Sequence, residues 1–294
     1  MSPAHAGVLL GGLLFAGCAR APAPDLAAPA AVIHEPGGDV YLVSNVSGQP
    51  LAKDGDGFIV SVSPVDGSRE LWARGGDGDV VLHAPRGMAV VDDELWVADV
   101  DVVRRFDLRS REPVGEVLIE GASMLWGVSA GADGNVYVSD VGLGGDLEPT
   151  GTDAIWRITR AGEVSALIQG VELGQPSAIS AQRAGLYVAG WRDGAFFQVD
   201  YRGAKTDLSR APQARLSGLV RLEVEGYLGG RRGLVPTWFA SSWDGGTIYR
   251  FALSGGVTPL GASLEQPGAL GVDAARRRLL VPLTRSGRLH LEQL

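Results

Sequence analysis

Apolar, β-branched and aromatic residues recur along this chain in short runs, most of which end on a small, acidic or amide residue. Tyr-Leu-Val-Ser-Asn at residues 41–45 and Leu-Trp-Val-Ala-Asp at residues 95–99 are two examples. The six runs are residues 41–45, 95–99, 136–140, 186–190, 238–242 and 279–283. Short runs of this composition, bounded by turn residues, are typical of buried β-strands.

A second strand-like run follows each of these runs after a loop. The second runs are residues 57–62, 102–106, 154–158, 195–199, 247–251 and 288–291. A unit that recurs every ~40–50 residues, with strands and no helices, indicates a β-propeller. The pattern therefore predicts an all-β fold: a six-bladed β-propeller of four-stranded antiparallel blades.

The way in which the ring of blades closes stays open at this point. The first strand of each blade is expected to line a central channel, and the sequence ends just after the third strand of the last blade. A segment within residues 27–34 must therefore either supply the missing strand of the last blade or open the first blade.

The composition narrows the class of partner. The chain has 294 residues, of which 45% are hydrophobic and 20% are charged, and its formal net charge is -8. These values are ordinary for a globular protein with a large core. The acidic balance argues against nucleic acid as the main partner, because phosphate contacts need a basic stripe.

The N-terminal segment differs from the rest of the chain. Residues 8–16 are apolar but too short to cross a ~30 Å hydrocarbon core as a helix, and they have the length of a signal-peptide core. Phe15-Ala-Gly-Cys18 resembles the bacterial lipobox, although Phe15 replaces the usual Leu and no Lys or Arg precedes it. We expect a lipoprotein signal peptide at residues 1–17, lipidation of Cys18, an Ala/Pro-rich tether at residues 18–30 and the propeller at residues 31–294.

This organisation predicts where the protein resides. Cys18 is the only cysteine, so a chain lipidated there has no thiol left for a disulfide. Ala19 provides no inner-membrane retention signal of the aspartate kind. The expected location is the bacterial cell envelope, at the outer membrane and facing the periplasm, with the lipid as the only membrane contact.

Up-and-down strand order places the starts of the inner strands and the ends of the second strands on one face. The side chains expected around the channel mouth on this face are Asn45, Arg86, Asp99, Trp126, Asp140, Ser177, Trp191, Ser217 and Trp243. Convergent polar and aromatic groups at one mouth predict a ligand site. Two other roles stay open: acids and amides at strand ends often bond the backbone of the next turn, and tryptophans often pack between blades.

The chain resembles the regucalcin/gluconolactonase superfamily of six-bladed propellers, and in particular its bacterial secreted lipoprotein members. Residues 39–59 carry most of the likeness, Ala84-Pro-Arg-Gly-Met88 and residues 280–283 add to it, and it extends over residues 33–294. The resemblance implies a divalent-metal-dependent lactone or ester hydrolase. In such members a Glu, an Asn and an Asp hold the metal, and a second Asp acts as general base.

The metal ligands of that family are replaced in this sequence. Ser177 stands where the family has an Asn after Pro, Ser217 where it has an Asp before Gly, and Trp126 in place of the Asn of an Asn-Asp pair. Serine brings no charge to Ca²⁺ or Mg²⁺. We therefore expect a degraded metal site and no cofactor, with Glu35, Asp99 and Asp140 as an alternative ligand set for Ca²⁺ or another divalent cation.

Three functions compete on this basis. The first is a binding module for a small molecule or glycan at the channel mouth, the second is a metal-dependent hydrolase, and the third is an assembly factor that presents a flat face to an envelope protein. The replaced ligands favour binding over catalysis. A deep mouth with unpaired polar groups favours a ligand, whereas a plugged channel favours assembly.

Overall fold

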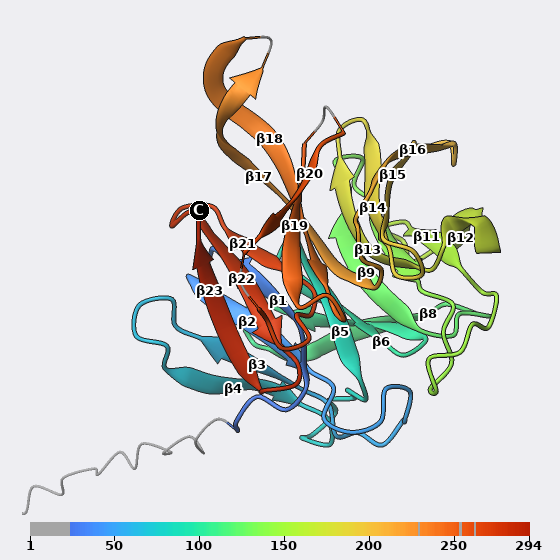
Figure 1. Cartoon of the computed structure of the whole chain (residues 1–294). Coiled ribbons are helices and arrows are strands. Elements are labelled where there is room, and N and C mark those ends of the chain that lie inside the picture. Colours follow the sequence, from blue (N-terminus) through green and yellow to red (C-terminus); the bar gives the residue numbers. More distant parts are fainter. Residues whose placement is uncertain (1–23, 229, 253–254, 262) are drawn as a thin grey trace, which may run out of the picture.

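The six recurring apolar runs become the second strands of six antiparallel sheets arranged around a common axis (Figure 1). The structure, a computed structural model, describes residues 24–228, 230–252, 255–261 and 263–294. The predicted signal peptide and the predicted lipidation site at Cys18 lie outside the described residues. The prediction of an all-β, six-bladed propeller is confirmed.

Each blade is a meander in which consecutive strands pair with one another. The first three blades contain β1 (Pro29–Glu35), β2 (Val40–Asn45), β3 (Phe58–Val62) and β4 (Arg69–Arg74); β5 (Pro85–Val91), β6 (Glu94–Asp99), β7 (Val102–Asp107) and β8 (Pro113–Leu118); and β9 (Leu125–Ala130), β10 (Val136–Asp140), β11 (Ala154–Ile158) and β12 (Val164–Gln169). After the 3-10 turn η1 (Val171–Leu173), the last three blades contain β13 (Pro176–Gln182), β14 (Gly185–Gly190), β15 (Ala195–Val199) and β16 (Lys205–Arg210); β17 (Leu216–Leu228), β18 (Arg231–Ser242), β19 (Thr247–Phe251) and β20 (Val257–Leu260); and β21 (Gly271–Asp273), β22 (Arg278–Leu283) and β23 (Arg288–Gln293).

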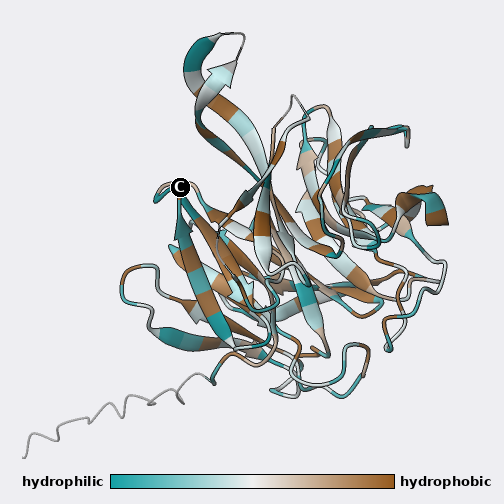
Figure 2. Ribbon diagram, viewed as in Figure 1, coloured by the Kyte–Doolittle hydropathy of each residue, from teal (hydrophilic) through white to brown (hydrophobic). Residues whose placement is uncertain are grey.

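Neighbouring blades bury their apolar faces against each other. Between the second and third blades, Trp96 and Val103 pack in one cluster with Leu125, Val138 and Ile158. Similar clusters recur around the ring, and Figure 2 shows apolar bands along the strands of the blades. A strand that is packed on both faces has no polar side, which explains why the recurring runs are continuously apolar rather than alternating.

The N-terminal strand closes the ring of blades. β1 is the innermost strand of the first blade and lies beside the chain that leads into β21, the innermost strand of the last blade. Ala269 N donates to the Ala30 carbonyl at 2.8 Å, and Val32 N donates to the Ala269 carbonyl at 3.3 Å. The segment therefore opens the first blade, and the last blade has three strands among the described residues.

The packed part of the chain begins before the predicted boundary at residue 31. Leu26 is buried, Ala27 N donates to Asn45 Oδ1 at 3.0 Å, and β1 already starts at Pro29. The end of the Ala/Pro-rich segment thus belongs to the propeller, because its alanines are small enough to lie between the first and last blades. No helix among the described residues is long and apolar enough to cross a membrane.

The strands run between two faces of the propeller. One face carries the starts of the inner strands, the ends of the second strands, and the loops at residues 46–57 and 141–153; we call it the mouth face. On the opposite face, β17 and β18 extend past the other strands as a projecting hairpin (Figure 1).

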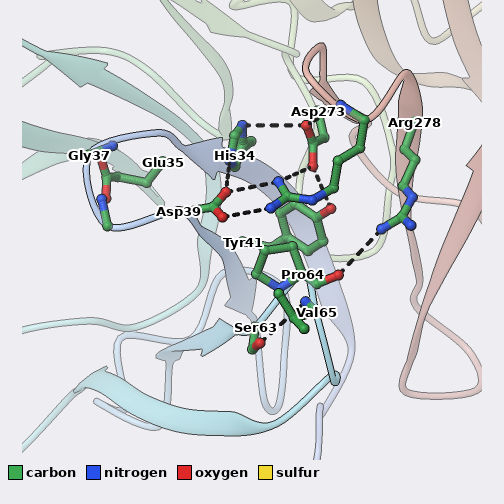
Figure 3. Close-up of polar contacts among 12 residues, drawn as sticks. His34, Glu35, Gly37, Asp39, Tyr41, Ser63, Pro64, Val65, Asp273 and Arg278 are labelled. Carbon is green, nitrogen blue, oxygen red and sulfur yellow. Dashed lines mark hydrogen bonds and ion pairs between the residues drawn. The ribbon is translucent and has the colours of Figure 1, made fainter.

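A polar cluster joins the first and last blades near the opposite face (Figure 3). This closure cluster consists of His34, Asp39, Tyr41, Asp273 and Arg276. Tyr41 Oη and Arg276 Nη1 both donate to Asp273 Oδ2, at 2.7 and 2.9 Å. Arg276 also donates to both carboxylate oxygens of Asp39, and His34 Nε2 lies 3.0 Å from Asp39 Oδ1. The cluster ties together two blades that are far apart in the sequence.

Candidate functional site

The mouth face contains a small, mainly apolar pocket above the central channel. Its volume is about 200 Å³. The pocket, which we call the mouth pocket, is lined by Ala28, Ala30, Val46, Gly48, Pro50, Arg86, Trp126, Leu147, Trp191, Trp243 and Thr284. Arg86 and Thr284 are the polar side chains of this lining, so the cavity offers mostly aromatic and aliphatic surface to a ligand.

Three tryptophans that the sequence placed at the mouth do meet there. Trp126 lies in β9, while Trp191 and Trp243 directly follow β14 and β18. The ring centroids of Trp126 and Trp191 are 5.1 Å apart, and those of Trp191 and Trp243 are 6.0 Å apart. Trp126 and Trp191 are almost fully buried, whereas Trp243 is partly exposed. The planes of neighbouring rings are tilted by 50° and 55°, so the three rings form an aromatic wall of the pocket rather than one flat surface.

Trp126 also separates the mouth pocket from the channel beneath it. Its indole Nε1 donates to the Ser217 carbonyl at 3.0 Å, which links the third blade to the fifth across the ring. The cavity among the inner strands, which Trp126 also lines, has a volume of only about 60 Å³. The channel is therefore nearly closed. By the criterion set from the sequence, a closed channel alone favours an assembly role, so ligand binding has to be argued from the mouth pocket and its polar groups.

Arg86 is a buried cation in the lining of the mouth pocket. Its exposed fraction is 5%, its Nη2 donates to the Pro50 carbonyl at 2.9 Å, and its Cζ lies 5.0 Å from the Trp126 ring. The Nε atom is buried and has no hydrogen-bond partner, and no carboxylate of the described chain forms an ion pair with Arg86. Burial lowers the pKa of Arg86 from 12.5 to about 10, and the more distant Asp99 opposes that shift. The guanidinium therefore carries its charge at neutral pH without a bonded anion.

The polar residues at the strand ends take a different role from the tryptophans. Asn45, Asp99 and Asp140 are fully buried and do not line the mouth pocket. Asn45 Oδ1 accepts the hydrogen bond from Ala27 N described above, and its Nδ2 donates to the Val43 carbonyl. The side chain therefore holds the entering N-terminal segment against the end of β2.

The two aspartates bond the backbone of the loop that leads into the inner strand of their own blade. Asp99 accepts from His83 N and Ala84 N, at 2.7–3.1 Å, and from Arg104 Nε at 3.2 Å. Asp140 accepts from the backbone N–H groups of Ser123, Met124 and Gly142, each at 3.0 Å. Such saturated carboxylates fix the loops around the mouth, and they have little capacity left for a ligand.

Ser177 and Ser217 join neighbouring inner strands. The Ser177 hydroxyl donates to the Leu216 carbonyl of the next blade, and the Ser217 hydroxyl donates to the Pro267 carbonyl at 2.6 Å. Both residues are fully buried and lie outside the lining of the mouth pocket. At the two positions where the resemblance implies metal ligands, this chain thus has hydroxyls that are used to hold blades together.

A related set of serines was missed in the sequence. Ser44, Ser139 and Ser241 are the next-to-last residues of β2, β10 and β18. Their hydroxyls donate to the carbonyls of Arg86, Ser177 and Gly268 in the following blade, at 2.7, 3.4 and 2.7 Å respectively. The signal was present, because a small residue recurs at this place in the apolar runs, but its structural cause is a contact with the next blade.

The alternative metal ligands are not brought together. β1 starts at the mouth face and runs to the opposite face, so Glu35 at its end is separated from Asp99 and Asp140 by the length of the strand. The Glu35 carboxylate accepts from Gly37 N and Gly38 N in the β1–β2 turn (Figure 3). Among the described residues, no three His, Cys, Asp or Glu side chains form a group that can hold a metal ion. The structure therefore does not bring Glu35 together with Asp99 and Asp140.

A wider and more polar groove continues from the mouth pocket. The groove has a volume of about 580 Å³ and shares Leu147 and Trp191 with the pocket. Its other lining residues are Pro149, Gln175, Arg192, Gln213, Ala214, Arg215 and Asp244. Arg215 is paired with Asp244 at 3.0 Å, and its Cζ lies 5.7 Å from the Trp191 ring. A ligand with its apolar part in the pocket can therefore extend a polar part into this groove.

Comparisons with known proteins support the fold. No protein-family model matches the sequence, and no curated protein matches it. Among solved structures, a gluconolactonase-family protein matches with a TM-score of 0.64 and 16% identity over 92% of each chain. Virginiamycin B lyase from Staphylococcus aureus, crystallised with quinupristin, matches with a TM-score of 0.56 and 13% identity, over 90% of this chain and 84% of that chain.

A third solved structure, of a luciferin-regenerating enzyme, matches with a TM-score of 0.57 and 11% identity, over 87% of this chain and 84% of that chain. These proteins have different activities in their names, and identities this low show a common fold only. The six-bladed propeller architecture inferred from the sequence is therefore confirmed, and the function has to be argued from the site.

Proposed function

We propose that this protein is a ligand-binding propeller that holds the flat, apolar part of a small molecule in the mouth pocket. The observation that carries the proposal is the cluster of Trp126, Trp191 and Trp243 in the lining of this cavity. Concave apolar sites with a few polar groups are the usual form of small-molecule sites.

The chemistry of the lining favours an aromatic or aliphatic ligand over a glycan. A sugar ring that enters a closed site needs hydrogen bonds for its hydroxyl groups, since unpaired hydroxyls are costly to bury. The pocket offers the side chains of Arg86 and Thr284 for this purpose, and Thr284 Oγ1 already donates to the Pro29 carbonyl at 2.8 Å. Polar substituents fit the adjoining groove better than they fit the pocket.

The size of the cavity limits the ligand further. Small-molecule pockets typically have volumes of roughly 300–1,000 Å³. A mouth pocket of about 200 Å³ therefore accepts one or two fused rings, with any larger part of the molecule in the groove of about 580 Å³.

The proposal excludes the metal-dependent hydrolysis implied by the family resemblance, because of the side chains that are present. The hydroxyls of Ser177 and Ser217 donate hydrogen bonds to backbone carbonyls of the neighbouring blades. The carboxylates of Asp99 and Asp140 accept hydrogen bonds from backbone N–H groups. None of these groups is free to bind a cation or to activate water.

We also propose that the protein is anchored in the cell envelope by a lipid on Cys18. Cys18→Ser tests this proposal, because the variant should be released from the membrane fraction.

Binding can be tested by isothermal titration calorimetry of residues 24–294 with three neutral aromatic amides: benzamide, indole-3-acetamide and naphthalene-2-carboxamide. At least one of them is expected to bind. Trp243→Ala should weaken that binding about tenfold or more, since it removes one stacking wall. Trp156→Ala is the matched control, because Trp156 lies in β11 and outside the mouth pocket. Binding that Trp243→Ala and Trp156→Ala affect equally would overturn the proposal.

A further inference from the structure

We propose that Arg86 is the counter-ion for a carboxylate of the ligand, so that the mouth pocket selects small aromatic carboxylates. This inference rests on the proposed binding function and adds the chemical class of the ligand. The family resemblance assigns no role to Arg86, and the inference depends only on the surroundings of its guanidinium group.

The first argument is the cost of the buried charge. A cation that leaves water needs an anion or a full set of hydrogen-bond acceptors to recover its solvation. Within the described chain, only Nη2 of the three Arg86 nitrogens donates a hydrogen bond, to the Pro50 carbonyl. The Trp126 ring gives part of the remaining compensation through its π face at 5.0 Å. The electrostatic deficit that remains lies beside an otherwise apolar cavity.

The second argument is that Asp99, the acid whose charge acts on the pKa of Arg86, already has other hydrogen-bond partners. Asp99 opposes the lowering of the Arg86 pKa, so its negative charge acts on Arg86 from a distance. Its two carboxylate oxygens accept from His83 N, Ala84 N and Arg104 Nε. A further anion for Arg86 therefore has to come from outside the described chain, and the mouth pocket is the way in.

A second arginine shows what a balanced guanidinium looks like in this protein. Arg105 also lies over a tryptophan, with its Cζ 4.8 Å from the Trp96 ring. Unlike Arg86, it forms a two-point ion pair with Glu94, in which Nε and Nη2 each donate at 2.8 Å. The stacked arginine and the tryptophan are thus common to both places, and only the carboxylate is missing at Arg86.

The geometry of the pocket favours a carboxylate over a phosphate. Phosphate groups are usually held by several donors, such as a series of backbone N–H groups together with a cation. The mouth pocket has one guanidinium in an aromatic and aliphatic lining. A carboxylate is planar and carries one delocalised charge, so it matches a single planar guanidinium. The planar ring of an aromatic acid can pack against the tryptophans.

The test uses pairs of probes that differ only in charge: benzoate and benzamide, indole-3-acetate and indole-3-acetamide, naphthalene-2-carboxylate and naphthalene-2-carboxamide. For the pair that binds best to the wild-type protein at pH 7, the carboxylate should bind about ten- to a hundredfold more tightly than the amide. Arg86→Gln should reduce this preference, taken as the ratio of the two affinities in the same variant, to about twofold or less.

Arg105→Gln is the matched control, and it should leave the preference for the carboxylate intact. Thermal unfolding of each variant checks that it is folded before its affinity is interpreted. Equal affinity of the wild-type protein for both members of a pair would overturn the role of Arg86, and so would a preference that persists in Arg86→Gln. Absence of binding by every amide and every carboxylate would instead overturn the proposed function itself.

Discussion

The mouth pocket and the closure cluster each contain a buried charge, but the two charges differ in how many hydrogen-bond and ion-pair partners the fold gives them. In the closure cluster, the fully buried Asp273 accepts hydrogen bonds from Tyr41 Oη, Arg276 N and Arg276 Nη1. In the mouth pocket, the guanidinium of Arg86 has one hydrogen bond and no ion pair. A buried charge whose hydrogen-bond and ion-pair partners all lie within the fold stabilises the architecture. A buried charge without an ion-pair partner, beside a cavity, supports the proposed ligand site.

The pKa shifts describe the same contrast. Burial raises the pKa of Asp273, but the hydrogen bonds from Tyr41 and Arg276 more than offset it, and the net pKa lies below the ordinary 3.8. For Arg86, burial dominates and the pKa falls to about 10. The charged form is thus stabilised by the fold in the first case and destabilised in the second.

The largest expected effect is on the closure cluster. Asp273→Ala removes the acceptor of three donors and leaves the Arg276 cation with the partly exposed Asp39 as its remaining partner. We expect the free energy of unfolding to fall by about 3 kcal/mol, because the buried Tyr41 hydroxyl and the Arg276 backbone N–H lose their acceptor. Urea denaturation measures this. Glu112→Ala, an exposed acid, is the control, and a similarly small loss in both variants would contradict the balanced-charge interpretation.

A smaller loss of stability is expected for Asp140→Ala. The change leaves the backbone N–H groups of Ser123 and Met124 without their acceptor, which costs about 2 kcal/mol. Binding of the aromatic probes should be preserved, because Asp140 does not line the mouth pocket. Urea denaturation measures the loss of stability, and calorimetry measures the binding of the probes. Asp146→Ala, in the loop that follows β10, is the control. Lost binding with unchanged stability would make Asp140 a ligand contact after all.

Acid should weaken the closure cluster. Hydrogen bonding to Arg276 holds the pKa of Asp39 below 3.8, and the pKa of Asp273 is also lowered. Groups with a lowered folded-state pKa contribute their stability fully above the unfolded-state value, and this contribution is lost as the pH falls below 3.8 through the folded-state values. Urea midpoints at pH 7, 4 and 3 should therefore fall less steeply for Asp39→Asn than for the wild-type protein. Parallel profiles would show that the cluster has no such role.

The smallest effect on stability is expected at Arg86. Arg86→Met replaces an unpaired buried cation by an apolar side chain of similar length, so we expect stability to stay the same or to rise by up to about 1 kcal/mol. Calorimetric unfolding with no ligand present measures this change. A loss of more than about 1 kcal/mol would show that the bond from Arg86 to the Pro50 carbonyl is an essential anchor of the loop at residues 46–57.

The repeated apolar runs made most of the fold predictable. The second and third strands of each blade lie where the runs are, because a strand packed between two blades must be apolar on both sides. The role of residues 27–34 was not predictable in the same way. Whether a strand closes the first blade or the last depends on contacts such as Ala269 N to the Ala30 carbonyl, between residues that are far apart in the sequence.

The candidate site was predictable in position and only partly in composition. Strand order alone places Trp126, Trp191 and Trp243 on one face, and the structure brings them into contact. The same reasoning placed Asp99 and Asp140 at that face, but it could not tell that their carboxylates are already bonded to backbone N–H groups. Leu147 and Thr284 had no signal of their own, since they reach the mouth pocket from loops whose paths the apolar pattern does not specify.

The sequence by itself determined the number of blades, the order of their strands and the face that carries the candidate site, because these follow from the period and polarity of local segments. Only the tertiary structure decided which polar groups remain available at that face. Availability depends on whether each donor or acceptor finds a partner in another blade, and the partners of Asp99, Ser177 and Arg86 are set by the packing of the whole ring.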